Sequence, residues 1–285
     1  MIKNIVFSGG GVKIYSFLGF IKAFEENNLF EHVESYIGTS AGALISALCV
    51  LGFKYKEIEE IVLKINANNL KNITTDNILN FFENFGLDNG ENFERIITII
   101  LEAKLKKSDI TFKELYEITN KQLIVTATCI NTMEIEYFDH IISPDIQVKK
   151  GLMMSIAIPL LFNPIKINNK YYSDGGIASH YPIEYFKEEK ENTYGILVIN
   201  KLNKCHTIEN IKDYMLNIMF CSHHNLIRAR YDEYKENTLL IETDNVNGLD
   251  FNIEYNTKIN LIEDTYIKTK ESIESKQFKD YFKLN

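Results

Sequence analysis

Residues 4–20 read NIVFSGGGVKIYSFLGF, and residues 35–51 read SYIGTSAGALISALCVL. In each stretch a short apolar run ends at a loop that contains glycine, and apolar residues then recur at the spacing of a helix face. The two stretches therefore predict the order strand, glycine loop, helix, strand, glycine-flanked serine, helix. Because strands that alternate with helices are typical of a mostly parallel sheet covered by helices, we expect an α/β fold.

The rest of the chain continues this alternation and contains no linker rich in proline, glycine or serine. Thr111 and Glu114 fit a capping box at the start of a helix. We therefore expect one domain over residues 1–285, with a core from about residue 3 to about residue 275. The pattern predicts strands at 122–129, 135–138, 165–167, 170–172, 194–199 and 238–243, helices at 151–157, 213–234 and 266–276, and mostly helical structure at 54–120.

The composition is that of a globular protein and excludes several functions. Of the 285 residues, 39 are acidic and 31 basic, which gives a net charge of −8. A dedicated nucleic-acid binder needs a basic face, so we expect no nucleic-acid partner. The four cysteines form no CxxC pair, so we expect free thiols and no zinc site. No run of about 18 apolar residues and no signal-peptide core occurs, which predicts a soluble, cytoplasmic protein.

A serine stands in the pattern Gly38-x-Ser40-x-Gly42, between a predicted strand and a predicted helix. On such a turn a serine projects its Oγ clear of the sheet, and small neighbours permit a strained backbone and a close approach of helix to strand. The pattern therefore indicates a nucleophile. The same residues also fit a serine N-cap between packing glycines, and this alternative stays open on the pattern alone.

Three consecutive glycines, Gly9, Gly10 and Gly11, end the first predicted strand and open a helix. Their N–H groups can converge on one point beside the positive end of the helix dipole, which makes the loop a candidate cradle for a phosphate or for the oxyanion of acyl transfer. The phosphate-loop pattern GxxxxGK[ST] is absent, and Ile14 replaces the third glycine of the dinucleotide pattern GxGxxG. A tight turn without a ligand is the alternative.

An aspartate followed by two glycines, Asp174-Gly175-Gly176, comes after a predicted hairpin. Asp-Gly alone is typical of a plain turn. A carboxylate beside two glycines can also approach another backbone closely and accept a proton from Ser40. The three motifs together are more informative than any one of them.

The order of the elements distinguishes two classes of serine hydrolase. An α/β-hydrolase generally has several strands before its nucleophile, and its triad ends with a histidine. Only one strand and one glycine loop precede Ser40, which favours a Ser–Asp dyad over a triad. Under the triad alternative the candidate histidines are His180, His206, His223 and His224.

In this order the three motifs resemble those of the patatin-like phospholipases, which carry GGGx[KR]G, then GxSxG, then DG[GA]. Lys13 stands at the basic position of the first motif, and Ile14 departs from the glycine that follows it. The N–H of Ile14 remains, but a positive φ at a β-branched residue would be costly. The similarity covers about residues 3–275, because further segments occur in family order. These segments are Thr111–Leu115, Ser155–Phe162, Tyr172–Gly176, Tyr181–Pro182 and Leu249–Phe251.

The resemblance implies a three-layer α/β/α patatin-like fold and a calcium-independent lipid acyl hydrolase of the phospholipase A type, without metal or cofactor. It implies Ser40 as the nucleophile and Asp174 as the general base. The implied oxyanion donors are the N–H groups of Gly9, Gly10 and Gly11, with Ala41 as an additional donor. The positions that support the motifs are Lys13, Gly38, Gly42, Gly175 and Gly176.

The implied substrate is a membrane phospholipid or another acyl-ester lipid, reached by transient contact with a membrane surface. The apolar run Ile156–Phe162 is a candidate wall for acyl chains, with ordinary core packing as its alternative. Lys13 either steers an anionic head group or pairs with a carboxylate. Two alternative functions stay open: an acyltransferase that uses the same acyl-Ser40 intermediate, and an inert lipid-binding or interaction protein. The sequence identifies no activating protein.

Overall fold

The computed structural model describes residues 1–65, 72–201, 208, 211–243, 246, 248 and 252–283. Its strands are β1 (Asn4–Phe7), β2 (Ser35–Gly38), β3 (Gly86–Asp88), β4 (Gln122–Cys129), β5 (Glu134–Phe138), β6 (Leu160–Phe162), β7 (Ile165–Ile167), β8 (Lys170–Asp174), β9 (Thr193–Asn200) and β10 (Thr238–Thr243). Its α-helices are α1 (Ile14–Glu26), α2 (Ala41–Val50), α3 (Tyr55–Lys64), α4 (Thr75–Leu79), α5 (Phe81–Asn84), α6 (Glu91–Leu105), α7 (Phe112–Thr119), α8 (Val148–Ile156), α9 (Ile211–Tyr234), α10 (Tyr255–Glu274) and α11 (Lys276–Phe282). Its 3₁₀ segments are η1 (Gly11–Lys13), η3 (Gly175–Ile177), η4 (Ile183–Asn192) and η5 (Lys235–Asn237).

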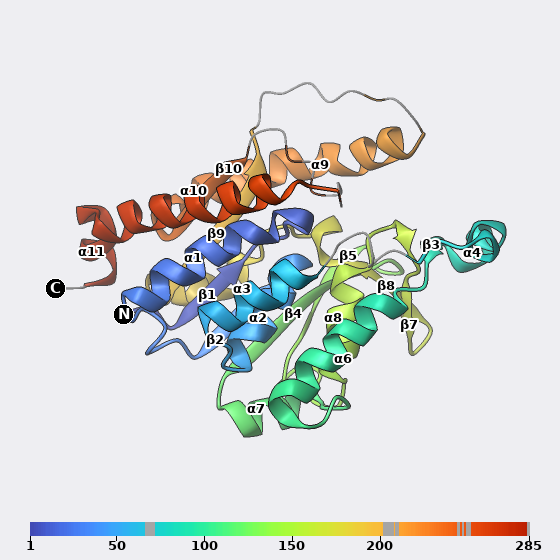
Figure 1. Ribbon diagram of the computed structural model, residues 1–285, viewed down its shortest axis with the longest axis horizontal. Helices are drawn as coiled ribbons and strands as arrows, with labels where there is room; N and C mark the ends of the chain where they lie inside the picture. Colours follow the sequence, from blue (N-terminus) through green and yellow to red (C-terminus); the bar gives the residue numbers. More distant parts are fainter. Residues whose placement is uncertain are drawn as a thin grey trace.

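An eight-stranded sheet forms the centre of the molecule (Figure 1), in the order β10-β9-β1-β2-β4-β8-β7, with β5 also paired to β4. The pairs β10–β9, β9–β1, β1–β2 and β2–β4 are parallel, whereas β5, β7 and β8 pair in the antiparallel sense. Strands β3 and β6 form a small second sheet. The mostly parallel sheet of an α/β fold, predicted from the sequence, is confirmed.

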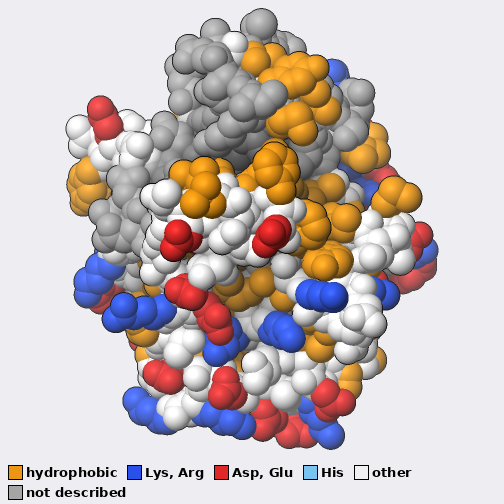
Figure 2. All heavy atoms as spheres, turned by 90° about the vertical axis from the view of Figure 1, so that its right-hand side faces the viewer, with side chains coloured by type: hydrophobic (Ala, Val, Ile, Leu, Met, Phe, Trp, Pro, Cys, Tyr) orange, Lys and Arg blue, Asp and Glu red, His pale blue; other side chains and the backbone are white. Residues whose placement is uncertain are grey.

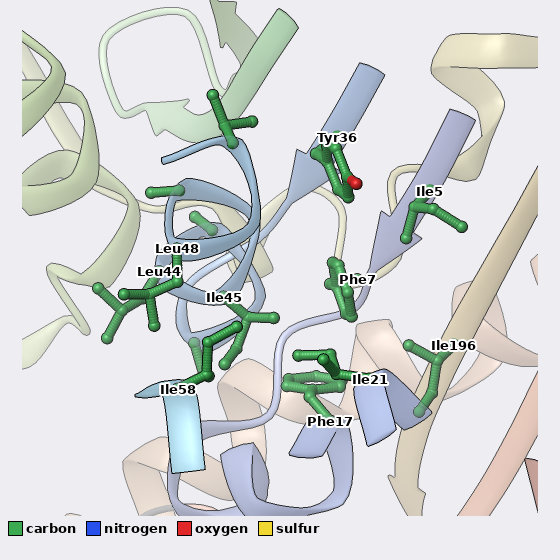
Figure 3. Packing of buried hydrophobic residues seen from close by; sticks show 14 of the residues in the cluster. Ile5, Phe7, Phe17, Ile21, Tyr36, Leu44, Ile45, Leu48, Ile58 and Ile196 are labelled. Atoms are coloured by element: carbon green, nitrogen blue, oxygen red, sulfur yellow. The ribbon is translucent and has the colours of Figure 1, made fainter. Parts of the chain in front are cut away.

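Alternating side chains of the strands explain why helices cover both faces of the sheet. Phe7 of β1 belongs to a large buried cluster that contains residues of α1, α2, α8 and α10, while the preceding residue, Val6, belongs to a second cluster with residues of η4 and α9. Successive residues of a strand point to opposite faces, so a strand that is apolar throughout needs cover on both sides. Figure 1 shows α10 lying along α1, and Figure 3 shows Phe17 and Ile21 of α1 close to Phe7.

Strand β4 brings the ends of two other strands together. On β4, Val125 pairs with Gly38 at the end of β2, and Ala127 pairs with Asp174 at the end of β8. At both positions β5 pairs along the opposite edge of β4. Strands β2 and β8 must therefore share the other edge and meet end to end. Two residues along a strand span only about 7 Å, so the chain that leaves β2 emerges beside Asp174.

The secondary structure departs from the sequence prediction in several places, because α11, β3 and β6 were not predicted and α10 begins earlier than expected. Helix α10 begins at Tyr255 instead of residue 266 and ends at Glu274, and the hydroxyl of the next residue, Ser275, caps α11. Within residues 54–120, predicted to be mostly helical, β3 pairs with β6, because a three-residue strand carries too little periodicity to be recognised. The capping box that begins at Thr111 is confirmed. None of the described helices is long and apolar enough to cross a bilayer.

Candidate active site

Ser40 lies on the tight turn between β2 and α2, with a backbone φ of 54° and ψ of −120°. Such a conformation costs a residue other than glycine about 1–3 kcal/mol and persists only where the surroundings hold it. Two features hold it here. The Ser40 N–H donates a hydrogen bond of 2.8 Å to the hydroxyl of the fully buried Ser155 on α8. A Cβ at Gly38 would lie 2.2 Å from the Gly42 carbonyl oxygen, and one at Gly42 would lie 2.4 Å from the Ser8 carbonyl oxygen.

The carboxyl of Asp174, at the end of β8, lies beside the Ser40 hydroxyl, which lowers its pKa. Its Oδ1 also accepts the Gly176 N–H at 2.7 Å, and its backbone carbonyl accepts the Thr128 hydroxyl at 2.9 Å. Gly175 leaves room for this arrangement, because a Cβ there would lie 2.3 Å from the Thr126 hydroxyl oxygen. The sequence motifs around Ser40 and Asp174 are thus adjacent in space, with both side chains more than 90% shielded from solvent.

Burial raises the pKa of Asp174 from 3.8 to about 6, against the opposing effect of the hydrogen bonds from Ser40 and Gly176. Desolvation disfavours the charged carboxylate, and the two donors recover only part of that loss. A carboxylate with this pKa is still mostly ionised at neutral pH, and it is a stronger base than an exposed aspartate. The pair can therefore transfer a proton from a hydroxyl to a carboxylate out of contact with bulk water.

Two of the three amides of the glycine loop lack a hydrogen-bond acceptor among the described residues. The Gly9 N–H donates to the His180 carbonyl at 2.7 Å, so the expectation that it serves as an oxyanion donor is corrected. Among the described residues, no hydrogen-bond acceptor is found for the N–H of Gly10, Gly11 or Ala41. The positive φ of the loop falls on Gly11, at 53°. Ile14 instead has the ordinary helical values of −48° and −28°, so its side chain imposes no backbone strain.

Lys13 and His180 lie next to the glycine loop. The Lys13 ammonium is buried and bonds the side-chain oxygen of Asn200 at 3.1 Å, so the expected carboxylate partner is replaced by an amide. Burial lowers the pKa of Lys13 to about 8. The His180 ring lies against Gly9, and its Nε2 is 3.3 Å from the Val198 carbonyl oxygen. The side chains of Lys13 and His180 thus pack beside the glycine loop.

A cavity extends from Ser40 and Gly11 between α1, α2, α3, α6, α8 and the start of α10. Ile156, Ile158 and Phe162 line it, as the candidate acyl wall Ile156–Phe162 predicted. Further lining comes from α3, from the residue after it and from α6, which the sequence did not indicate. These residues are Val62, Ile65, Phe93, Ile96 and Ile97. Helical periodicity predicts that such apolar residues share one face of a helix, but it does not show which cavity that face lines.

The structure describes two of the four cysteines, Cys49 and Cys129, and both are free thiols. Several other positions named from the sequence lie outside the residues or side chains that the structure describes. They are Cys205, His206, Cys221, His223, His224 and the segment Leu249–Phe251.

Comparison with known proteins identifies the family of this chain. Residues 5–187 match the family model "Patatin-like phospholipase". "Probable lipid hydrolase 463L" of Invertebrate iridescent virus 6 is 30% identical over 207 residues, which cover 70% of this chain and 70% of the viral protein. "Uncharacterized protein R571" of Acanthamoeba polyphaga mimivirus is 25% identical over 272 residues, which cover 92% of this chain and 90% of that protein.

A solved structure shares the fold. VipD from Legionella pneumophila superposes with a TM-score of 0.60 at 17% identity, over 95% of this chain and 66% of the VipD chain. The chain thus spans just under two thirds of VipD. The family match covers well over half of the chain and includes the glycine loop, Ser40 and Asp174. The chain therefore belongs to the patatin-like phospholipase family.

Proposed function

We propose that this chain is a lipid acyl hydrolase of the phospholipase A type, with Ser40 as the nucleophile and Asp174 as the general base. The observation that carries the proposal is that these two buried side chains lie beside one another and that Ser40 lines an apolar cavity. Family membership and the similarity to a viral protein named as a lipid hydrolase support the same class of reaction.

The reaction proceeds in two steps through an acyl-enzyme. The Ser40 Oγ attacks the ester carbonyl carbon while its proton passes to Asp174. The tetrahedral intermediate expels the alcohol of the lipid, which takes that proton from Asp174. Water then attacks the acyl-Ser40 ester, again losing a proton to Asp174, and the intermediate releases the fatty acid and regenerates Ser40.

The negative charge of each tetrahedral intermediate falls on the former carbonyl oxygen. The N–H groups of Gly10, Gly11 and Ala41 are the proposed donors, because none has an acceptor among the described residues and both Gly11 and Ala41 line the cavity. One oxyanion donor typically contributes about 10²–10³ in rate. The positive end of α2, which begins at Ala41, adds to this stabilisation.

The proposal includes transient contact with a membrane. Exposed apolar side chains of α4, α5 and α9 lie at one end of the molecule, where Figure 2 shows orange side chains gathered over its surface. Figure 1 places α4 and the N-terminal end of α9 at this end. Large exposed apolar patches are typical of membrane or partner contacts. The residues of this patch are Ile78, Leu79, Phe82, Phe85, Tyr214, Met215 and Ile218.

The decisive experiment compares Ser40→Ala with Ser46→Ala. Ser46 is also a fully buried serine of this region, and its hydroxyl has no hydrogen-bond partner among the described residues, so its removal is a matched control. We expect Ser40→Ala to abolish fatty-acid release from phospholipid in the presence of chelator, and Ser46→Ala to retain it. Equal activity of Ser40→Ala and wild type would overturn the proposal.

A further inference from the structure

The cavity beside Ser40 contains a single charged group among the described residues that line it. Most of the lining consists of isoleucine, leucine, valine and phenylalanine side chains, and the charged group is Lys258 of α10. The mechanism proposed above does not use this lysine. A cation that lines an otherwise apolar lipid cavity is energetically unfavourable unless water or a ligand solvates it.

Lys258 is held in place without neutralising its charge. Its ammonium lies 5.2 Å from the centre of the Tyr15 ring, which is 3% exposed and lines the same cavity. A cation over an aromatic face keeps its full charge and its three N–H donors. No carboxylate of a described residue forms an ion pair with Lys258.

Lys258 and Ser40 differ in their exposure to solvent. Ser40 is almost completely buried, whereas Lys258 is half-buried and so belongs to a part of the cavity lining that reaches solvent. An ester carbonyl bound at Ser40 would direct its acyl chain along the isoleucine-rich walls. The charged part of a lipid must remain near solvent, because its transfer into the apolar lining would be costly. A free fatty acid does not fit this arrangement, since its carboxylate would lie at Ser40.

We propose that Lys258 binds the phosphate diester of a glycerophospholipid while the scissile ester lies at Ser40, and thereby gives the enzyme its preference for phospholipids over neutral glycerides. This inference rests on the proposed function. Lysine is a common phosphate-binding residue, and the hydrogen bond from an ammonium to a phosphate is charge-assisted at both ends. Lys258 is then a specificity-determining residue outside the Ser–Asp pair.

The test compares two lipids with identical oleoyl chains, dioleoylphosphatidylcholine and dioleoylglycerol, in the same uncharged detergent micelles. Neither lipid gives the micelle a net charge, so long-range attraction does not contribute. We expect Lys258→Met to lower the ratio of kcat/KM for phosphatidylcholine to that for dioleoylglycerol about tenfold, the usual effect of one charge-assisted hydrogen bond. Methionine still covers Tyr15, so a role in packing alone would leave the ratio unchanged.

Two further variants separate the charge from the fold. Lys258→Arg keeps a cation that binds phosphate and should keep most of the preference. Lys268→Met removes an exposed lysine from the same helix and should leave the ratio at its wild-type value. An unchanged ratio in Lys258→Met, or an equal loss with both lipids, would overturn the proposal.

A binding measurement makes the inference independent of catalysis. Titration of dihexanoylphosphatidylcholine, below its micelle concentration, into Ser40→Ala and into Ser40→Ala/Lys258→Met gives Kd by calorimetry. We expect the double variant to bind about tenfold more weakly. If no lipid is hydrolysed but this difference is found, the proposed function fails and the phosphate site stands. If hydrolysis depends on Ser40 but the two Kd values are equal, the phosphate site is wrong.

Discussion

Lowering the pH should inactivate this enzyme at an unusually high value for a reaction that depends on an aspartate. The perturbed group is Asp174, whose pKa burial raises from 3.8 to about 6. At pH 5 a carboxyl of pKa 6 is ionised in only about 10% of molecules, whereas an ordinary aspartate would be ionised in about 95%. The proposed base must be ionised to accept the Ser40 proton. We therefore expect kcat/KM to fall about tenfold for each pH unit below about 6.

The assay is the release of butyrate from a water-soluble butyrate ester between pH 4.5 and 8, followed by chromatography so that ionisation of the product does not affect detection. Such an ester removes the lipid surface from the experiment, and kcat/KM reports the free enzyme. Circular dichroism at each pH checks that the protein stays folded. A kcat/KM that remains constant from pH 8 to pH 4.5 would refute the raised pKa or the role of Asp174.

The same shift has a consequence for stability, with a definite sign. Because the folded-state pKa of Asp174 lies above its unfolded value, the folded protein binds the proton more tightly, and this stabilisation is complete below about pH 4 and lost as the pH rises through about 6. A shift of about two units corresponds to about 3 kcal/mol. Asp174→Asn does not titrate, so its free energy of unfolding should increase relative to wild type by about this amount between pH 4 and pH 7. A constant difference would contradict the desolvation argument.

Two further predictions concern the turn at Ser40 and the exposed apolar patch. Ser155→Ala removes the acceptor of the Ser40 N–H, so we expect the unfolding free energy to fall by about 1–3 kcal/mol and kcat to fall with little change in KM. The control Ser46→Ala should change neither the unfolding free energy nor kcat. Equal behaviour of the two variants would contradict the positioning role of Ser155. Phe82 is 85% exposed on α5, so Phe82→Ser should lower the fraction of protein that sediments with phosphatidylcholine vesicles several-fold. The control Ile118→Ser, on α7, should leave this fraction unchanged. Equal binding by both variants would exclude the patch as a membrane contact.

The sequence predicted the parts of the fold that depend on local pattern. The glycine-rich loop, the turn around Ser40 and the helices after them follow from apolar periodicity and from glycine, which are properties of short segments. The capping box at Thr111 was readable for the same reason. The short strand β3 and the start of α10 at Tyr255 were not readable, because their stability comes from pairing with β6 and packing against α1.

The motifs around Ser40 and Asp174 were also visible in the sequence, because each requires small residues beside a polar one. Their proximity could only be expected, since Ser40 and Asp174 are 134 positions apart in the sequence. The register of β4 decides it: Gly38 and Asp174 pair two residues apart along one edge of the same strand. Strand pairing between distant segments leaves no trace in local periodicity.

The amino-acid sequence therefore specifies the set of chemical groups: a serine on a tight turn, an aspartate before glycines, and backbone amides at the start of a helix. Their surroundings became visible only in the folded structure. It showed that the Gly9 amide is already bonded to His180, that burial raises the pKa of Asp174, and that Lys258 lines the cavity. Hydrogen-bond occupancy, desolvation and cavity shape depend on which distant segments surround a residue, and only the folded chain specifies those neighbours.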